Sequence, residues 1–240
     1  PMNVLSKQVT QELYEAFTEI NNDPEIIVAI LTGAGDRAFM AGADIKEFPE
    51  SLGKSKEELL AGNLESHKVL NFINDLPKPT IAVLNGLAFG GGCELALTCD
   101  IRIAESHVQI GLPEIKLGLF PGGGGTQRLP RLIGEAKAKE IMFIGDPLTA
   151  EEAEKLGIVN HVVEKGTGMD FALSMAKKIS GYSLPALSRI KRAVNEGNDT
   201  NIQQGLELEA ELFAELFAFE DVREGVQAFI EKRKPVFKHK

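Results

Sequence analysis

The sequence predicts an α/β fold in which strands and helices alternate over the first two thirds of the chain and helices alone fill the last third. Two short apolar runs rich in Ile and Val, residues 26–33 and 80–86, have the length and composition of buried strands. A polar, helix-prone stretch, residues 54–75, separates them, and everything from Met169 onward has helical spacing. Such layers of strands and helices are typical of α/β proteins.

The first helix is expected in residues 5–23. Apolar side chains recur there with the spacing of one helical face, at Leu5, Val9, Leu13, Phe17 and Ile20. Ser6 is a candidate N-cap, and the sequence Asn-Asn-Asp-Pro ends the helix in a turn. The first buried strand follows directly.

The middle of the chain continues the alternation of strands and helices. A Pro-Lys-Pro sequence introduces the second strand, and a glycine run with a short helix follows it. Thr149 and Glu152 have the spacing of a capping box, which starts a helix that ends at Gly157. The other expected elements are strands at residues 99–105 and 158–164, a loop entering a helix at 121–134, a helix at 135–145, and C-terminal helices through residue 232.

Composition restricts the class of protein and its partners. Of the 240 residues, 43% are hydrophobic and 25% charged, as in ordinary soluble proteins. No apolar run reaches the roughly 18 to 20 residues that cross a bilayer, and residues 1–8 lack a signal-peptide pattern. Two cysteines favour a reducing compartment. A cytoplasmic, bacterial-like location is therefore expected, and the mitochondrial matrix stays open if an N-terminal segment is missing. The net charge of −9 disfavours nucleic acid.

Several familiar catalytic motifs fail on their context. Residues 32–38, TGAGDRA, formally satisfy the dinucleotide fingerprint, but Gly42 and Pro49 interrupt the helix that this fingerprint must open. A strand-to-loop turn explains them better. The chain contains neither a G-x-S-x-G nucleophile elbow nor a Walker A loop. The histidines and cysteines lack the spacing of metal ligands, so no metal is expected, and His67 is interpreted as a surface or packing residue.

Two glycine runs stand where a strand or loop becomes a helix, at residues 90–92 and 122–125. The first N–H groups of a helix have no intrahelical acceptor and carry partial positive charge, so such a junction favours an anion. Glycine also lets a ligand approach the backbone closely. A phosphate or an oxyanion developing on a carbonyl would suit such a site. Pattern alone equally allows glycines that only permit tight packing of a strand against a helix.

Two glutamates lie beside these features. Glu94 falls in the first turn of the short helix, where a carboxylate ordinarily complements the helix N-terminus. Glu114 stands among Leu112, Ile115 and Leu117, an apolar setting that would raise its pKa. If the fold brought the two carboxyls together, their pKa values would separate and yield one acid and one base. The residues alone leave open whether they meet.

Four segments together resemble the crotonase (enoyl-CoA hydratase/isomerase) superfamily, and within it the enoyl-CoA hydratases most. In chain order they are AFMAGADIKEF, NGLAFGGGCELALTCDIRIA, IGLPEIKLGLFPGGGGTQRLPRLIG and AFIEKRKPVF. The resemblance covers essentially the whole chain. It implies a crotonase-like spiral of β-β-α turns with the acyl-CoA site in residues 1–180, and a helical C-terminal trimerisation region in residues 181–240. The family usually carries a further strand pair at the start, which we expect to be missing here.

The resemblance also implies where the site lies. The N–H groups of Ala43 and Gly91 would form an oxyanion hole for the thioester oxygen of an acyl-CoA. Glu94 would position and deprotonate water, and Glu114 would deliver a proton to C2 of the substrate. The expected substrate and CoA contacts are Ala41, Ala43, Asp44, Ile45, Lys46, Gly91 and Gly122.

The implied reaction is syn addition of water to a 2-trans-enoyl-CoA, giving a 3-hydroxyacyl-CoA. Such a hydro-lyase of fatty acid metabolism needs no cofactor, because coenzyme A is part of the substrate. Relatives with other chemistries commonly lack one of the two glutamates, so the presence of both favours hydration. The alternatives are a Δ3,Δ2-enoyl-CoA isomerase or another acyl-CoA enzyme of the superfamily.

The expected partners are the acyl-CoA thioester and further copies of the chain, in a homotrimer or a hexamer built as a dimer of trimers. Neither nucleic acid nor a membrane is expected. A non-catalytic relative that binds acyl-CoA or RNA is disfavoured by the pair of glutamates and by the acidic pI of about 5.1.

Overall fold

The computed structural model describes residues 2–240, except for the side chains of Ile45 and Phe48. Eight strands lie in this part of the chain: β1 (Ala29–Thr32), β2 (Ala38–Met40), β3 (Thr80–Leu84), β4 (Leu87–Phe89), β5 (Ile101–Glu105), β6 (Gln109–Gly111), β7 (Leu148–Thr149) and β8 (His161–Val163). They form two four-stranded sheets, ordered β1-β3-β5-β8 and β2-β4-β6-β7. The first sheet is parallel throughout. In the second, only the pairing of β6 with β7 is antiparallel.

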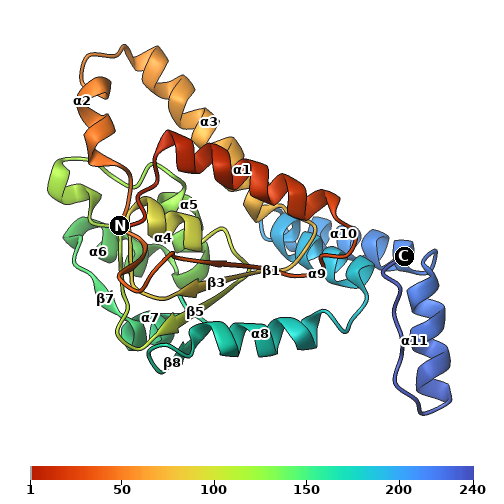
Figure 1. The fold of residues 1–240 in the computed structure, drawn as a ribbon. Helices are drawn as coiled ribbons and strands as arrows, with labels where there is room; N and C mark the ends of the chain where they lie inside the picture. Colours follow the sequence, from red (N-terminus) through yellow and green to blue (C-terminus); the bar gives the residue numbers. More distant parts are fainter. Residues whose placement is uncertain (1) are drawn as a thin grey trace.

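The chain alternates between the two sheets. Each of the pairs β1–β2, β3–β4 and β5–β6 places one strand in the first sheet and the next strand in the second. A parallel neighbour requires a crossover connection, and the helices after β2 and β4 supply it. The predicted α/β fold, a spiral of β-β-α turns, is therefore confirmed (Figure 1).

Eleven helices and two short 3-10 turns account for most of the remaining described residues. They are α1 (Lys7–Asn22), η1 (Ile45–Glu47), α2 (Phe48–Ser51), α3 (Lys56–Asn74), α4 (Gly91–Ala96), η2 (Glu114–Leu117), α5 (Gly125–Ile133), α6 (Glu135–Ile144), α7 (Ala150–Leu156), α8 (Gly168–Ile179), α9 (Leu184–Gly197), α10 (Ile202–Leu216) and α11 (Glu220–Ile230). Two predicted caps are confirmed. The Ser6 side chain accepts from Val9 N–H at the start of α1, and Thr149 and Glu152 form a reciprocal capping box at α7.

The first sheet lies between helices on both faces, with α1 and α3 on one side and α8 on the other (Figure 1). Strand β3 shows how one strand serves both layers, because successive side chains point to opposite faces. Ala82 and Leu84 belong to the main core, whereas Ile81 and Val83 pack with Ala172 of α8. Every residue of β3 is buried, which explains its continuous apolar sequence.

Four strands were not predicted from the sequence, and two predicted ones are shorter in the structure. β2, β4, β6 and β7 have only two or three residues each, too few for an alternating pattern to emerge. The strand expected at residues 158–164 begins only at His161, because the N–H groups of Ile158 and Val159 both donate to the carbonyl of Ala153 at the end of α7. The strand expected at 26–33 begins at Ala29 after a turn closed by Ile26 N–H and Asp23 O.

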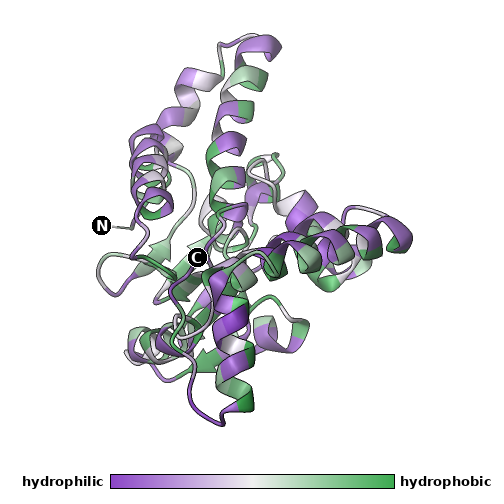
Figure 2. Cartoon of the chain, turned by 90° about the vertical axis from the view of Figure 1, so that its right-hand side faces the viewer, coloured by the Kyte–Doolittle hydropathy of each residue, from purple (hydrophilic) through white to green (hydrophobic). Residues whose placement is uncertain are grey.

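The last four helices follow the spiral as predicted, and α9 packs against α10. Several large apolar side chains remain exposed on the last three: Ile190, Val194, Ile202, Leu206, Phe213, Phe217, Val226, Phe229 and Ile230. Figure 2 shows these helices striped with hydrophobic and hydrophilic residues, and Figure 1 shows α11 standing away from the body of the chain. The division at residue 180 stays a prediction. Within residues 2–240, no helix has both the length and the apolar character needed to span a bilayer.

Candidate active site

The glycine run at residues 90–92 permits close packing around the start of α4, one of the two purposes that the sequence left open. A Cβ on Gly92 would collide with the carbonyl of Met40, so this glycine permits tight packing of α4 on β2. Gly90 has φ of +52°, which L side chains rarely adopt, and a Cβ there would lie 3.0 Å from Oε1 of Glu114. Gly91, the first residue of α4, lies where a Cβ would be 3.7 Å from the nitrogen of Ala43. The run therefore lets α4 start against two backbone segments and one carboxyl group.

Ala43 and Gly91 present unused N–H groups beside one another. Ala43 forms a parallel bridge with Leu5, in which Leu5 N–H donates to Gly42 O (2.8 Å) and Asp44 N–H donates to Leu5 O (3.4 Å). This pattern leaves the N–H of Ala43 itself facing away from Leu5. The N–H of Gly91 opens α4 and has no intrahelical acceptor. Among residues 2–240, neither group donates a hydrogen bond, so the pair can hold an oxygen that carries negative charge.

Glu94 is held by the second glycine loop. Its side chain is 3% exposed, and Oε1 accepts from the N–H groups of Gly123 (2.7 Å) and Gly125 (2.8 Å). Burial raises the pKa of the Glu94 carboxyl, while these two N–H groups and the positive charge of Arg128 oppose the rise. The contact joins the two glycine runs through a carboxylate. Complementing the start of α4 therefore does not account for all the contacts of Glu94.

Glu114 reaches the same place from the other side, at the first residue of η2. Its Oε1 lies beside Gly90, and its buried Oε2 has no hydrogen-bond partner among residues 2–240. Burial raises the pKa of the Glu114 carboxyl to about 7, and the charge of Glu94 adds to the rise. The structure thus brings the two glutamates near enough for their charges to interact. Both pKa values move up; the N–H groups of Gly123 and Gly125 oppose the rise at Glu94, and the backbone N–H of Glu114 itself opposes the rise at Glu114.

The other expected contact residues surround this centre. Ala41 N–H is used within the backbone, since it faces the carbonyls of Met2 (3.1 Å) and Asn3 (3.2 Å). Asp44 and Lys46 lie where the chain leaves Ala43, with Lys46 N–H bound to Oδ1 of Asp44 (3.0 Å) and the Lys46 side chain exposed. The backbone of Ile45 starts η1, but its side chain lies outside the described part of the structure.

Several residues in and around the second glycine loop were not assigned from the sequence. Gly122, an expected acyl contact, lies where a Cβ would be 3.6 Å from Nδ2 of Asn63 on α3. Its carbonyl accepts from Nε2 of His67 (2.5 Å), so His67 packs at the site rather than on an open surface. Gly123, Gly125 and Arg128 also belong here, and no local pattern reveals that they meet Glu94.

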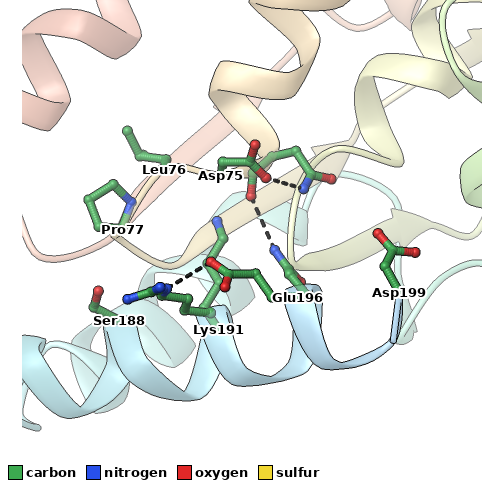
Figure 3. A pocket seen from close by; sticks show the side chains of 10 residues that line it. Asp75, Leu76, Pro77, Ser188, Lys191, Glu196 and Asp199 are labelled. Atoms are coloured by element: carbon green, nitrogen blue, oxygen red, sulfur yellow. Dashed lines mark hydrogen bonds and ion pairs between the residues drawn. The ribbon is translucent and has the colours of Figure 1, made fainter. Parts of the chain in front are cut away.

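A cavity elsewhere in the described residues is a different feature. It has a volume of about 410 Å³ and lies between the end of α3 and helix α9. Figure 3 shows Asp75, Leu76 and Pro77 facing side chains of α9 across it. Three ion pairs involve its lining residues, Lys191 with Asp100, Arg192 with Glu196 and Asp199 with Arg131. Neither Glu94 nor Glu114 lines it. No cluster of three or more His, Cys, Asp or Glu side chains in residues 2–240 could hold a metal ion.

Comparison with known proteins places this geometry in a family. The family model described as enoyl-CoA hydratase/isomerase matches residues 1–240. The chain is 44% identical over 240 residues to a crotonyl-CoA hydratase of Syntrophomonas wolfei, covering 98% of this chain and 90% of the relative. It is 43% identical over 234 residues to a short-chain-enoyl-CoA hydratase of Clostridium acetobutylicum, covering 97% and 88%.

Solved structures agree with the sequence comparison. The crystal structure of an enoyl-CoA hydratase from Bacillus anthracis superposes with a TM-score of 0.93 at 39% identity, covering 100% of this chain and 92% of that one. One from Geobacillus kaustophilus gives a TM-score of 0.92 at 41% identity, covering 99% and 90%. The chain belongs to the enoyl-CoA hydratase/isomerase (crotonase) family.

Proposed function

We propose that this protein is an enoyl-CoA hydratase, a hydro-lyase that adds water syn across the double bond of a 2-trans-enoyl-CoA. The observation that carries the proposal is the pairing of two glutamates of raised pKa, Glu94 and Glu114, beside two unused N–H groups. The names of the two bacterial relatives described above support hydration of short enoyl chains. The substrate is an acyl-CoA thioester, and no further cofactor enters the reaction.

The N–H groups of Ala43 and Gly91 bind the thioester oxygen of the substrate. As water adds to C3, the electrons of the double bond move toward the thioester and negative charge develops on this oxygen. Donors already aimed at that oxygen stabilise the charge without reorganising, and one such donor contributes about 3 to 4 kcal/mol in other enzymes. Gly90 and Gly91 are glycines because the thioester must reach this backbone.

Glu94 is the base. Its Oε1 is occupied by the N–H groups of Gly123 and Gly125, and no donor from residues 2–240 reaches Oε2. That oxygen is therefore available to orient a water and take its proton, while the hydroxyl oxygen forms the bond to C3.

Glu114 is the acid. With a pKa of about 7, a large fraction of its carboxyls are protonated near neutral pH. The proton moves from Glu114 to C2, on the same face as the added hydroxyl, and the enolate collapses to the 3-hydroxyacyl thioester. The step leaves Glu94 protonated and Glu114 ionised, and proton exchange through solvent restores both before the next turnover. The net change is the addition of one water.

The test follows the loss of enoyl-thioester absorbance on adding crotonyl-CoA, for the wild type, Glu114→Gln and Glu94→Gln. Rapid loss by the wild type that both substitutions suppress supports the proposal. No loss by the wild type would overturn hydration of short chains. If Glu94→Gln keeps full activity in moving the double bond of a 3-enoyl-CoA, the isomerase becomes the better assignment, because that reaction needs Glu114 alone.

The oligomeric state belongs to the same proposal. The exposed apolar side chains of α9, α10 and α11, including Phe229 at 85% exposure, are an unusual surface for a lone subunit. We expect them to be buried in a homotrimer, or in a hexamer of two trimers, which the molar mass from light scattering will distinguish from a monomer. The cytoplasmic location and the role in fatty acid metabolism stay predictions.

A further inference from the structure

The second glycine loop, which binds Glu94, is itself bound by side chains of other elements. Gly123 and Gly125 turn their N–H groups toward Glu94. Two carbonyls of the same loop face donors on other elements. Gly122 O accepts from Nε2 of His67 on α3 (2.5 Å), and Gly123 O accepts from Nη1 of Arg128 on α5 (3.2 Å). The loop is therefore bound by the Glu94 carboxylate on one side and by nitrogen donors of His67 and Arg128 on the other.

Arg128 connects this loop to helix α3. Its Nη2 donates to Oδ1 of Asn71 (2.7 Å), and its Nε donates to Oδ1 of Asn74 (3.3 Å). Gly124 has φ of +106°, and a Cβ on it would collide with Nη1 of Arg128, so the guanidinium packs directly on the loop backbone. Three nitrogens of one planar group thus reach three acceptors on two elements. A lysine has a single nitrogen and cannot reproduce this fork.

We infer that Arg128 is a positioning residue for the reaction: it fixes the second glycine loop against α3, so that Gly123 and Gly125 hold Oε1 of Glu94 and leave Oε2 for the water. The inference rests on the proposed function, because it gives Arg128 its effect through Glu94. Arg128 itself contacts the loop and α3 rather than the reacting atoms.

Electrostatics provides a signature that a packing role alone would lack. The titratable and charged groups around Glu94 are Arg128 from α5, His67 from α3, Glu114 from η2 and the buried thiol of Cys93 on its own helix. Arg128 lowers the pKa of Glu94 against the rise caused by burial. Loss of its charge and of the ordered loop therefore moves the pKa of Glu94 upward. The base is then protonated over a wider pH range, and the acid limb of kcat/KM moves to higher pH.

The test compares Arg128→Gln and Arg128→Lys with a matched control on the same helix, Arg131→Gln. Arg131 lies one turn further along α5 and pairs with exposed Asp199 instead of the loop. For crotonyl-CoA hydration, Arg128→Gln should lower kcat roughly 10- to 100-fold, because a displacement of about 1 Å in a catalytic group has that effect. KM should change less than about twofold, since substrate binding does not use Arg128. Arg128→Lys should have a kcat between those of Arg128→Gln and the wild type, with the acid limb of its pH profile close to that of the wild type. Arg131→Gln should have the kcat, KM and pH profile of the wild type.

A double-mutant cycle with Glu94→Gln completes the test. If Arg128 acts through Glu94, adding Arg128→Gln to Glu94→Gln should cause little further loss. The inference is overturned if Arg128→Gln keeps the wild-type kcat and the wild-type acid limb of the pH profile. It is also overturned if the acid limb does not move and the fold-losses in kcat of Arg128→Gln and Glu94→Gln multiply in the double variant. Circular dichroism and thermal melts check folding. Should Arg128→Gln fail to fold, the same criteria apply to Arg128→Lys. Failure of the proposed function is distinct, since the wild type itself would then not hydrate crotonyl-CoA.

Discussion

The two glutamates lie near one another but in different surroundings. Glu94 lies in the first turn of α4, is almost fully buried, and has one carboxylate oxygen bound by two backbone N–H groups. Glu114 lies at the start of a 3-10 turn, and its buried Oε2 has no partner in the described chain. Burial favours the neutral form of both carboxyls, and at Glu94 the two N–H groups and the charge of Arg128 oppose this effect. In the proposed reaction, these different surroundings are what lets one of two identical side chains act as the base and the other as the acid.

The comparison also separates the uses of glycine around the two groups. On the side of Glu94, glycines supply N–H groups and leave room for the carboxylate, since a Cβ on Gly123 would be 2.6 Å from Oε2. On the side of Glu114, Gly90 supplies space and a positive φ but no hydrogen bond to the carboxyl. One oxygen of Glu94 is therefore held by backbone N–H groups, whereas Oε2 of Glu114 is buried without a hydrogen-bond partner in the described chain.

The largest expected effect comes from removing the proposed base, Glu94. Glu94→Gln should lower kcat for crotonyl-CoA hydration by about 10²- to 10⁴-fold, the usual contribution of a positioned acid or base. The amide oxygen of Gln can still accept from Gly123 and Gly125, so the melting temperature should change little. Initial rates and thermal melts of the same preparation check both statements. A large loss of stability would mean that Glu94 holds the fold rather than the water.

A smaller effect is expected from crowding Glu94 while keeping its carboxylate. Gly123→Ala places a methyl group 2.6 Å from Oε2 and 3.3 Å from Leu70, so the carboxylate or the loop must shift. We expect kcat to fall roughly 10- to 100-fold, because a misplacement of about 1 Å has an effect of this size.

The control is Gly62→Ala, inside α3, where a Cβ would meet nothing within 4 Å. This change should leave kcat unaltered and raise stability by about 0.5 to 1 kcal/mol, as expected for alanine in a helix. Equal activity of Gly123→Ala and wild type would contradict a fixed position for Glu94.

Sequence analysis named the central residues of this site but not the residues that hold them in place. The motifs around Ala43, Gly91, Glu94 and Glu114 were identified through their resemblance to a family, and the structure brings these residues together. From the residues alone, complementing the start of its helix was the preferred explanation of Glu94. Its real partners are 29 and 31 positions away, and such contacts follow from the path of two loops that no local pattern encodes.

The fold shows the same limit. Long helices such as α1 and α3 and the buried strand β3 carry enough residues for periodicity to show. The second sheet, built from strands of two or three residues, escaped prediction, although β2 and β4 bring Met40 and Gly90 to the site. His67 and Arg128 were also missed, because each lies on an ordinary polar helix surface until the glycine loop folds against it.

The smallest expected effect is on stability, and it concerns Glu114. Its pKa is about 7 in the folded protein, above the ordinary value of 4.5. The unfolded chain therefore releases this proton first, and the stabilising effect of the neutral carboxyl is lost as pH rises from 4.5 to about 7. Glu114→Gln removes this titration. The variant should gain stability over the wild type through that window, reaching about 1 to 2 kcal/mol above pH 7 after allowance for solvent screening.

Thermal melts of wild type, Glu114→Gln and a control, Glu25→Gln, between about pH 4.5 and 8.5 measure this difference directly. Glu25 is exposed, so its substitution should give a stability difference that does not follow the same curve. A difference for Glu114→Gln that stays constant across the range would mean that the carboxyl titrates alike in the folded and unfolded chain. Glu114 would then be as well solvated as any surface glutamate, and the neutral acid proposed for protonating C2 would have no structural basis. If the stability difference between Glu114→Gln and the wild type instead grows through this pH window and then levels off, Glu114 loses its proton there in the folded protein. The wild type would then lose stability as it loses the neutral carboxyl that the proposed reaction requires.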